Sequence, residues 1–113
     1  AYAENKLQID RAPQTHETLA EGITSELPIR TQMLMEAMRT TNGAFTIVDE
    51  SEIQAGMQIL ASKGIYVEPT SAVIVKAFDK FVANGIIGEG DLTVSILTGS
   101  GLKATDKLMK RET

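Results

Sequence analysis

Thr98 and the glycines after it are the residues of this sequence best suited to bind a ligand. The order Thr98-Gly99-Ser100-Gly101 follows a strand-like run. It offers an exposed hydroxyl, a backbone that a ligand can approach closely, and amide donors that could face an anion. Spacing alone favours a plainer interpretation, a glycine-rich turn between a strand and a helix with a capping hydroxyl. The residues by themselves leave both interpretations open.

A second segment, Glu68-Pro69-Thr70-Ser71-Ala72, combines a carboxylate, a proline and two hydroxyls. Its plain structural interpretation is the start of a helix, with Pro69 fixing the entry to the helix and Thr70 or Ser71 as the N-cap. The carboxylate of Glu68 would then stand just before the helix.

Hydrophobic periodicity and turn residues predict the elements that carry these segments. Helices are predicted over residues 28–42, 49–63 and 70–84, strands over 44–48 and 92–97, and a brief extended segment at 65–67. Asp49 and Glu52 match a capping box at the start of the second helix. Residues 104–111 are expected to form a frayed final helix.

Strands that alternate with helices predict an α/β fold, in three layers with a short parallel sheet flanked by helices. Ligands of such sheets bind beyond the carboxyl ends of the strands, which is the place predicted for Thr98. Residues 1–17 show no sustained period and are poorly specified. Residues 18–113 are expected to form a single α/β domain.

Composition excludes several classes of function. The 113 residues contain no cysteine, which excludes a disulfide scaffold, a thiolate metal site and a cysteine nucleophile. The apolar run at 72–75 is far shorter than a membrane span, and no basic-then-apolar leader opens the chain. With a net charge of −4 and scattered basic residues, nucleic acid is not the expected partner. A cytoplasmic location is the default expectation.

Other candidate residues have plainer interpretations. No metal site is expected, because carboxylates in the first turn of a helix serve capping and the helix dipole. A lone histidine, a loop glutamate and a lysine near a helix start are expected to be solvated, and the methionines to fill the core. The first-turn carboxylates are Asp49, Glu50 and Glu52. The residues expected to be solvated are His16, Glu21 and Lys103, and the methionines stand at 33, 35, 38, 57 and 109.

Taken together, several segments resemble the C-terminal part of threonine synthases, pyridoxal-phosphate enzymes of fold type II, the tryptophan-synthase-β-like type. The matching segments occur in the family's order: Thr-Leu-Ala-Glu-Gly-Ile at 18–23, Pro-Ile-Arg at 28–30, Val-Glu-Pro-Thr-Ser-Ala at 67–72 and Leu-Thr-Gly-Ser-Gly-Leu-Lys at 97–103. Dehydratases of this fold type carry Glu-Pro-Ala-Gly-Ala and Ser-Gly-Gly-Asn at the two diagnostic places. The resemblance therefore favours threonine synthase, with cysteate-synthase-like and threonine-dehydratase-like enzymes as alternatives.

The resemblance implies pyridoxal phosphate as the cofactor and assigns residues to it. Thr98, followed by Gly99, would donate or share a hydrogen bond with the pyridine nitrogen. The Glu21-Gly22 turn would pass beside the ring, and Glu68 would lie near the ring face. A neutral hydroxyl stabilises a protonated pyridine less than a carboxylate would, so Thr98 would tune the cofactor without breaking bonds. The complete enzyme would convert a small amino-acid substrate, O-phosphohomoserine, and water into threonine and phosphate.

The sequence also departs from the family's pattern. None of its lysines stands in a Ser-Phe-Lys-Asp context, and it contains no Gly-Gly-Gly-Asn loop for the cofactor phosphate. The chain alone is therefore expected to be an inactive C-terminal fragment whose partner is the N-terminal part of the same enzyme. Such a fragment should expose an apolar face and self-associate, with a homodimer as one outcome. The competing hypothesis is a stand-alone, non-catalytic α/β binding domain.

Overall fold

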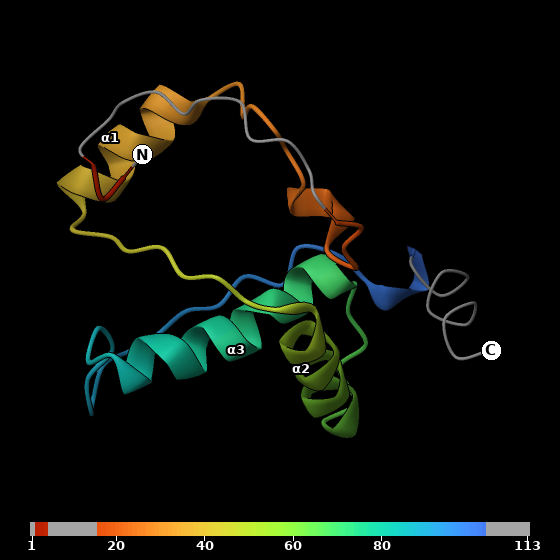
Figure 1. Ribbon diagram of the computed structural model, residues 1–113. Helices are drawn as coiled ribbons and strands as arrows, with labels where there is room; N and C mark the ends of the chain where they lie inside the picture. The colour runs from red at the N-terminus through yellow and green to blue at the C-terminus, as the bar shows by residue number, and fades with distance from the viewer. Residues whose placement is uncertain (1, 5–15, 104–113) are drawn as a thin grey trace. The chain divides into compact units, whose positions relative to one another are not determined.

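The computed structural model describes residues 2–4 and 16–103, and in this part of the chain every regular element is a helix (Figure 1). In chain order these are the 3-10 helix η1 (Glu21–Ile23), the α-helices α1 (Thr31–Thr40), α2 (Glu50–Ser62) and α3 (Pro69–Ala83), and the 3-10 helix η2 (Gly101–Lys103). None of them has the length and hydrophobicity that a bilayer span requires. The helix predicted at 104–111 lies outside the described residues.

The described residues fall into two compact units. The first contains residues 2–4, 16–17 and 24–45 and includes α1, and the second contains residues 18–23 and 46–103 with all the other elements. Each unit buries apolar side chains of its own, Met35 in the first and Ala20, Ile53, Val67 and Ala72 in the second. The division into a segment 1–17 and a domain 18–113 stays a prediction.

In the first unit, α1 begins at Thr31, later than the predicted start at Pro28. Pro28 lies in the preceding turn, where its carbonyl accepts a hydrogen bond from the Thr31 amide at 3.3 Å. After the helix, Asn42 has a φ of 54°, which confirms the left-handed residue predicted at this end. The Tyr2 hydroxyl donates to the Gly43 carbonyl at 2.8 Å, so the start of the chain packs against the end of α1.

The second unit begins its helical part with α2, whose ends agree with the prediction. The Asp49 amide donates to Oε2 of Glu52 at 2.8 Å in a capping box. At the other end, Gly64 has a φ of 76°, and the Ile65 amide donates back to the Leu60 carbonyl at 3.0 Å. The interpretation of Asp49 and Glu52 as capping residues is confirmed.

α3 starts earlier in the sequence than a hydroxyl cap at Thr70 or Ser71 would allow. Glu68 is the N-cap residue and Pro69 is the first helical residue, where proline's missing amide costs nothing. The prediction that Thr70 or Ser71 caps this helix is therefore wrong, because both lie inside the first turn and no side chain caps the helix. Gly85, with a φ of 69°, ends the helix as predicted.

α2 and α3 cross near the start of α3 (Figure 1), and a glycine sets their separation. A Cβ atom added to Gly56 would lie 2.6 Å from the Ala72 carbonyl oxygen and 3.4 Å from Cβ of Val75. Gly56 is buried, and Ala72 has no exposed surface. The two helix backbones therefore approach more closely than any other residue at position 56 would allow.

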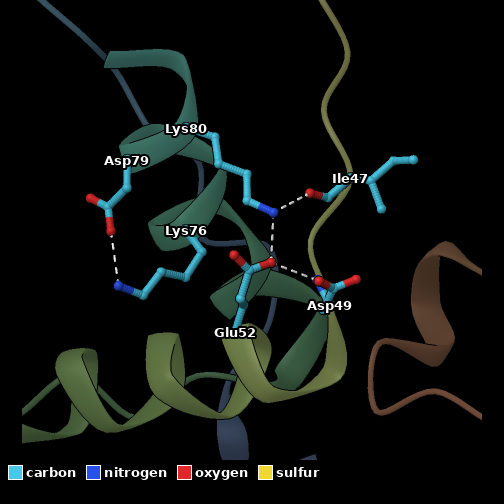
Figure 2. A network of polar contacts seen from close by, with 6 residues as sticks. All are labelled: Ile47, Asp49, Glu52, Lys76, Asp79 and Lys80. Atoms are coloured by element: carbon cyan, nitrogen blue, oxygen red, sulfur yellow. Dashed lines mark hydrogen bonds and ion pairs between the residues drawn. The ribbon is translucent and has the colours of Figure 1, made fainter. Parts of the chain in front are cut away.

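Figure 2 shows the polar contacts that join these two helices. Nζ of Lys80 in α3 lies 2.7 Å from Oε2 of Glu52 in α2 and donates to the Ile47 carbonyl, also at 2.7 Å. The Lys80 ammonium, together with a backbone amide, lowers the pKa of Glu52. The neighbouring ion pair of Lys76 and Asp79, 2.9 Å apart, lies within α3.

The predicted parallel sheet is absent from the described residues. Residues 44–48 and 92–97 carry the β-branched side chains of strands, but neither run pairs with a neighbour. The described part of the chain has one β-type contact, an antiparallel bridge between Val67 and Ser100. Strand formation requires backbone partners on an adjacent strand, and the described residues supply none beside either run. The described residues therefore do not show the predicted three-layer arrangement.

The unpaired runs expose their apolar side chains. Leu92, Val94 and Ile96 alternate along the chain and are 94, 80 and 74% exposed, and Ile47 is 82% exposed. Exposed apolar side chains were predicted from the sequence and are present in the described residues. That they form a docking face and cause self-association stays a prediction.

Candidate functional site

The candidate site lies at the first turn of α3, in the second unit. There the segment 65–68 runs beside the segment 98–101, held by two backbone hydrogen bonds. The Glu68 amide donates to the Gly99 carbonyl and the Gly101 amide to the Tyr66 carbonyl, each at 3.1 Å. The structure thus brings Glu68, Thr98 and Gly99 together, although 30 residues separate Glu68 from Thr98.

Ser71 is the centre of the polar contacts in this site. Its Oγ accepts hydrogen bonds from the Thr98 amide at 2.9 Å and from the Gly99 amide at 3.0 Å, and it lies 2.9 Å from Oγ1 of Thr98. Ser71 is only 1% exposed. A buried hydroxyl on a helix therefore fixes the backbone of the segment 98–101, called the threonine loop below, and the side chain of Thr98.

Glu68 lies across this loop. Its Oε1 is 3.3 Å from Oγ1 of Thr98, which donates to it. A Cβ atom on Gly99 would come within 2.2 Å of the same Oε1, so the carboxylate occupies the space that a side chain at 99 would fill. Glu68 also stands at the N-cap of α3, where the helix dipole favours a negative charge.

Gly101, two residues after Gly99, also leaves room for a side chain of the segment 65–68. A Cβ atom there would lie 2.7 Å from the ring of Tyr66. Gly99 and Gly101 therefore have a structural reason of their own, because each leaves room for a side chain of the segment 65–68.

Glu21 and Gly22 lie on η1, against the same first turn of α3. The Gly22 amide donates to Oγ1 of Thr70 at 3.2 Å, and a Cβ atom on Gly22 would lie 2.9 Å from that oxygen. Glu21 is exposed. The first turn of α3 thus contacts η1 through Thr70 and the threonine loop through Ser71.

Glu50 anchors the segment that carries η1. Its carboxylate accepts hydrogen bonds from the Thr18 hydroxyl and from the Leu19 amide, the latter at 2.9 Å. Ala20, which follows, is 2% exposed. Sequence reasoning had assigned Glu50 to the first turn of a helix, where it is, but had not predicted this second role.

Sequence reasoning also missed Ser71 and Thr70 as residues that hold the site. A signal for them was present, since proline prefers the first helical position and thereby makes Glu68 the N-cap. The two hydroxyls are then not needed as caps and are free to bind other segments. Which segments they bind depends on contacts 27 residues away for Ser71 and 48 for Thr70, and no local pattern encodes these.

Chemically, the site presents an exposed hydroxyl whose backbone is fixed, with a carboxylate beside it. Thr98 is exposed, while the serine that holds it is buried. Among the described residues, no group of three or more histidine, cysteine or acidic side chains could hold a metal ion. The arrangement suits a single directional hydrogen bond from Thr98 to a ligand, next to the negatively charged carboxylate of Glu68.

Comparison with known proteins places this sequence in a family. The pyridoxal-phosphate dependent enzyme family matches residues 3–99. The chain is 36% identical over 94 residues to the threonine synthase of Halalkalibacterium halodurans, covering 82% of the chain and 27% of the relative. It is 32% identical over 100 residues to that of Mycobacterium leprae, covering 87% and 28%. It is 34% identical over 95 residues to that of Methanocaldococcus jannaschii, covering 83% and 24%.

The chain spans about a quarter of the length of these relatives. No solved structure matches it. The family match covers most of the chain and includes Glu21, Gly22, Glu68, Thr98 and Gly99. The resemblance inferred from the motifs is thereby confirmed, and the chain belongs to the pyridoxal-phosphate dependent enzyme family, with threonine synthases among its homologues.

Proposed function

We propose that this chain forms the part of a threonine-synthase active site that faces the pyridine nitrogen of pyridoxal phosphate. The reaction would convert O-phosphohomoserine and water into threonine and phosphate. Homology to threonine synthases over most of the chain supports this assignment. A cytoplasmic location and an N-terminal polypeptide as partner belong to the same proposal.

The single observation that carries the proposal is the state of the Thr98 hydroxyl. Thr98 is exposed, its backbone amide is held by a buried serine, and its hydroxyl lies 3.3 Å from Oε1 of Glu68. That distance exceeds the usual O–H···O range of about 2.5–3.0 Å, so a ligand nitrogen can compete for the proton.

The residues present fit one end of the cofactor. Thr98 would bind the ring nitrogen, Gly99 leaves the space beside it to the Glu68 carboxylate, and η1 adjoins the same turn of α3. When bound, the cofactor supplies an electron sink for the substrate. Thr98 holds that sink at moderate strength, because a neutral hydroxyl favours a protonated ring nitrogen less than a carboxylate does.

A chimeric enzyme tests this proposal. The stretch of the Halalkalibacterium halodurans threonine synthase that matches this chain is replaced by the chain's own residues, and phosphate release from O-phosphohomoserine is measured. Turnover comparable to that of the parent enzyme supports the proposal. Within the chimera, Thr98→Val should lower turnover about tenfold, the scale of one lost hydrogen bond, whereas Thr98→Ser should retain it.

The alternatives give different results in the same assay. A dehydratase-like chain would deaminate serine or threonine, and a cysteate-synthase-like chain would act on O-phosphoserine without making threonine. A non-catalytic binding domain would give a folded chimera without turnover, in which Thr98→Val has no effect on cofactor absorbance.

A further inference from the structure

The Ser71 hydroxyl takes part in three hydrogen bonds of the site, and their directions can be worked out. Its Oγ has three polar neighbours: the Thr98 amide at 2.9 Å, the Gly99 amide at 3.0 Å and Oγ1 of Thr98 at 2.9 Å. Distances alone allow either hydroxyl to donate to the other. The two amides remove this ambiguity.

A serine hydroxyl has one proton to donate and two lone pairs that accept. Backbone amides only donate, so the Thr98 and Gly99 amides use both lone pairs of Ser71 Oγ. What Ser71 has left is its proton, and the third neighbour is Oγ1 of Thr98. Ser71 therefore donates to Thr98.

The opposite direction would leave a buried group unsatisfied. If Thr98 donated to Ser71, Ser71 Oγ would accept three hydrogen bonds, and its own proton would have no acceptor at a position that is 1% exposed. A buried donor without a partner is strongly disfavoured.

We infer that Ser71 is a positioning residue that makes Thr98 an obligatory donor. Because Thr98 Oγ1 accepts from Ser71, its own proton must point away, toward the exposed side where Oε1 of Glu68 lies. The ligand atom that replaces this carboxylate must then be an acceptor. This step rests on the proposed function: the acceptor is the ring nitrogen, which must then carry no proton. Ser71 acts through Thr98 and does not contact the ring nitrogen.

Ser71 is well placed for this role because α3 fixes it. Its amide donates to the Glu68 carbonyl at 3.0 Å in the first helical turn, so its position depends on the same turn that places Glu68. One turn of helix therefore places both the serine that donates to Thr98 and the carboxylate that accepts a hydrogen bond from Thr98.

The inference is tested on the chain itself, without cofactor, by NMR in an equal mixture of H2O and D2O. A slowly exchanging hydroxyl splits the signal of its Cβ carbon into protonated and deuterated forms. Ser71 should give two Cβ signals because its proton is buried and bonded, and Thr98 one averaged signal because its proton faces solvent. Two signals for Thr98 and one for Ser71 would overturn the inference.

Amide exchange in variants gives a second, independent readout. Ser71→Ala should speed hydrogen exchange of both the Thr98 and Gly99 amides about tenfold, since both lose their acceptor. Thr98→Val should leave both amides protected and should abolish the two-signal pattern of Ser71. Thr70→Ala is the matched control, because that hydroxyl in the same turn binds the Gly22 amide and not the loop. Equal loss of protection in Thr98→Val and Ser71→Ala would refute the assignment.

These measurements separate the inference from the proposed function. The NMR pattern reports the direction of the Ser71–Thr98 hydrogen bond whether or not the chain ever binds a cofactor. If the pattern is as expected while the chimera neither turns over nor responds to Thr98→Val, the direction stands and the threonine-synthase proposal fails. If the chimera is active and the pattern is reversed, the inference on Ser71 fails alone.

Discussion

Replacing Gly56 by alanine should destabilise the second unit, against the intrinsic preference of an α-helix. A Cβ atom at this position would lie 2.6 Å from the Ala72 carbonyl oxygen, and real Cβ atoms essentially never come within 3.0 Å of a heavy atom from another part of the chain. The obstacle is backbone and cannot rotate away. α2 and α3 must therefore move apart by at least 0.4 Å, the difference between 3.0 and 2.6 Å.

Two opposing contributions set the magnitude. Alanine is a better helix former than glycine by about 1 kcal/mol in a helix interior. Overpacking a tight contact costs about 1–3 kcal/mol. The net effect of Gly56→Ala is thus a loss of up to about 2 kcal/mol in the free energy of unfolding, and each kcal/mol lowers the melting temperature by about 4–8 °C in small domains.

The assay is urea unfolding followed by far-ultraviolet circular dichroism, with Gln58 as the internal reference. Gln58 is exposed on the same helix, so Gln58→Ala should be more stable than Gln58→Gly by about 1 kcal/mol, the propensity difference alone. At position 56 the order should reverse, with glycine more stable than alanine. If Gly56→Ala is stabilising by the increment seen at position 58, the close approach of α2 and α3 is refuted.

The remaining predictions concern pH, packing and association. Glu52→Gln should flatten the acid limb of stability: the pKa of Glu52 is lowered by its ion pair with α3, so its contribution is present above the usual value of 4.5 and is lost as pH falls through the folded-state value. Urea unfolding between pH 7 and pH 3 measures this, and parallel curves for the two proteins would contradict it. Gly101→Ala should lower the melting temperature because its Cβ would meet the Tyr66 ring at 2.7 Å, and an unchanged melting temperature would show that the ring moves at no cost. Val94→Lys should reduce self-association in sedimentation velocity, whereas Ser95→Lys, at the alternate position of the same run, should not, and equal effects of the two would argue against an apolar contact face.

The helices of this chain were predictable because their signals are local. The capping box of Asp49 and Glu52 and the positive φ of Gly64 lie at the ends of α2, and Gly85 lies at the end of α3. Each of these residues acts on its own helix terminus through contacts within a few residues. The start of α3 was misplaced because a proline and two hydroxyls competed for the same cap.

The strands were not predictable in the same way, because a strand is completed by residues far away in the sequence. Residues 92–97 have the composition of a buried strand, and the described residues contain no backbone beside them to pair with. Propensity indicates what a segment prefers when a neighbour is present. It does not indicate whether the neighbour is there.

The candidate site was predictable in part, less well than the helices and better than the strands. Glu68, Thr98 and Gly99 were chosen from the sequence, and the structure brings them together, although their roles toward a cofactor stay predictions. The direction of the Ser71 hydrogen bond was not predictable, because it depends on two amides that meet the serine only when the chain has folded.

The polar site forms without a sheet because its hydrogen bonds and the apolar run at 92–97 require different partners. The contacts of Glu68 and Ser71 with the loop at 98–101 are hydrogen bonds between two short segments, and they are complete within the described residues. Leu92 and Val94 instead need apolar cover, and full burial of each such side chain would contribute about 1.5–3 kcal/mol. That unrealised burial is the driving force we propose for docking of a complementary polypeptide. Docking would then leave the Ser71–Thr98 geometry as it is, because the chain forms it alone.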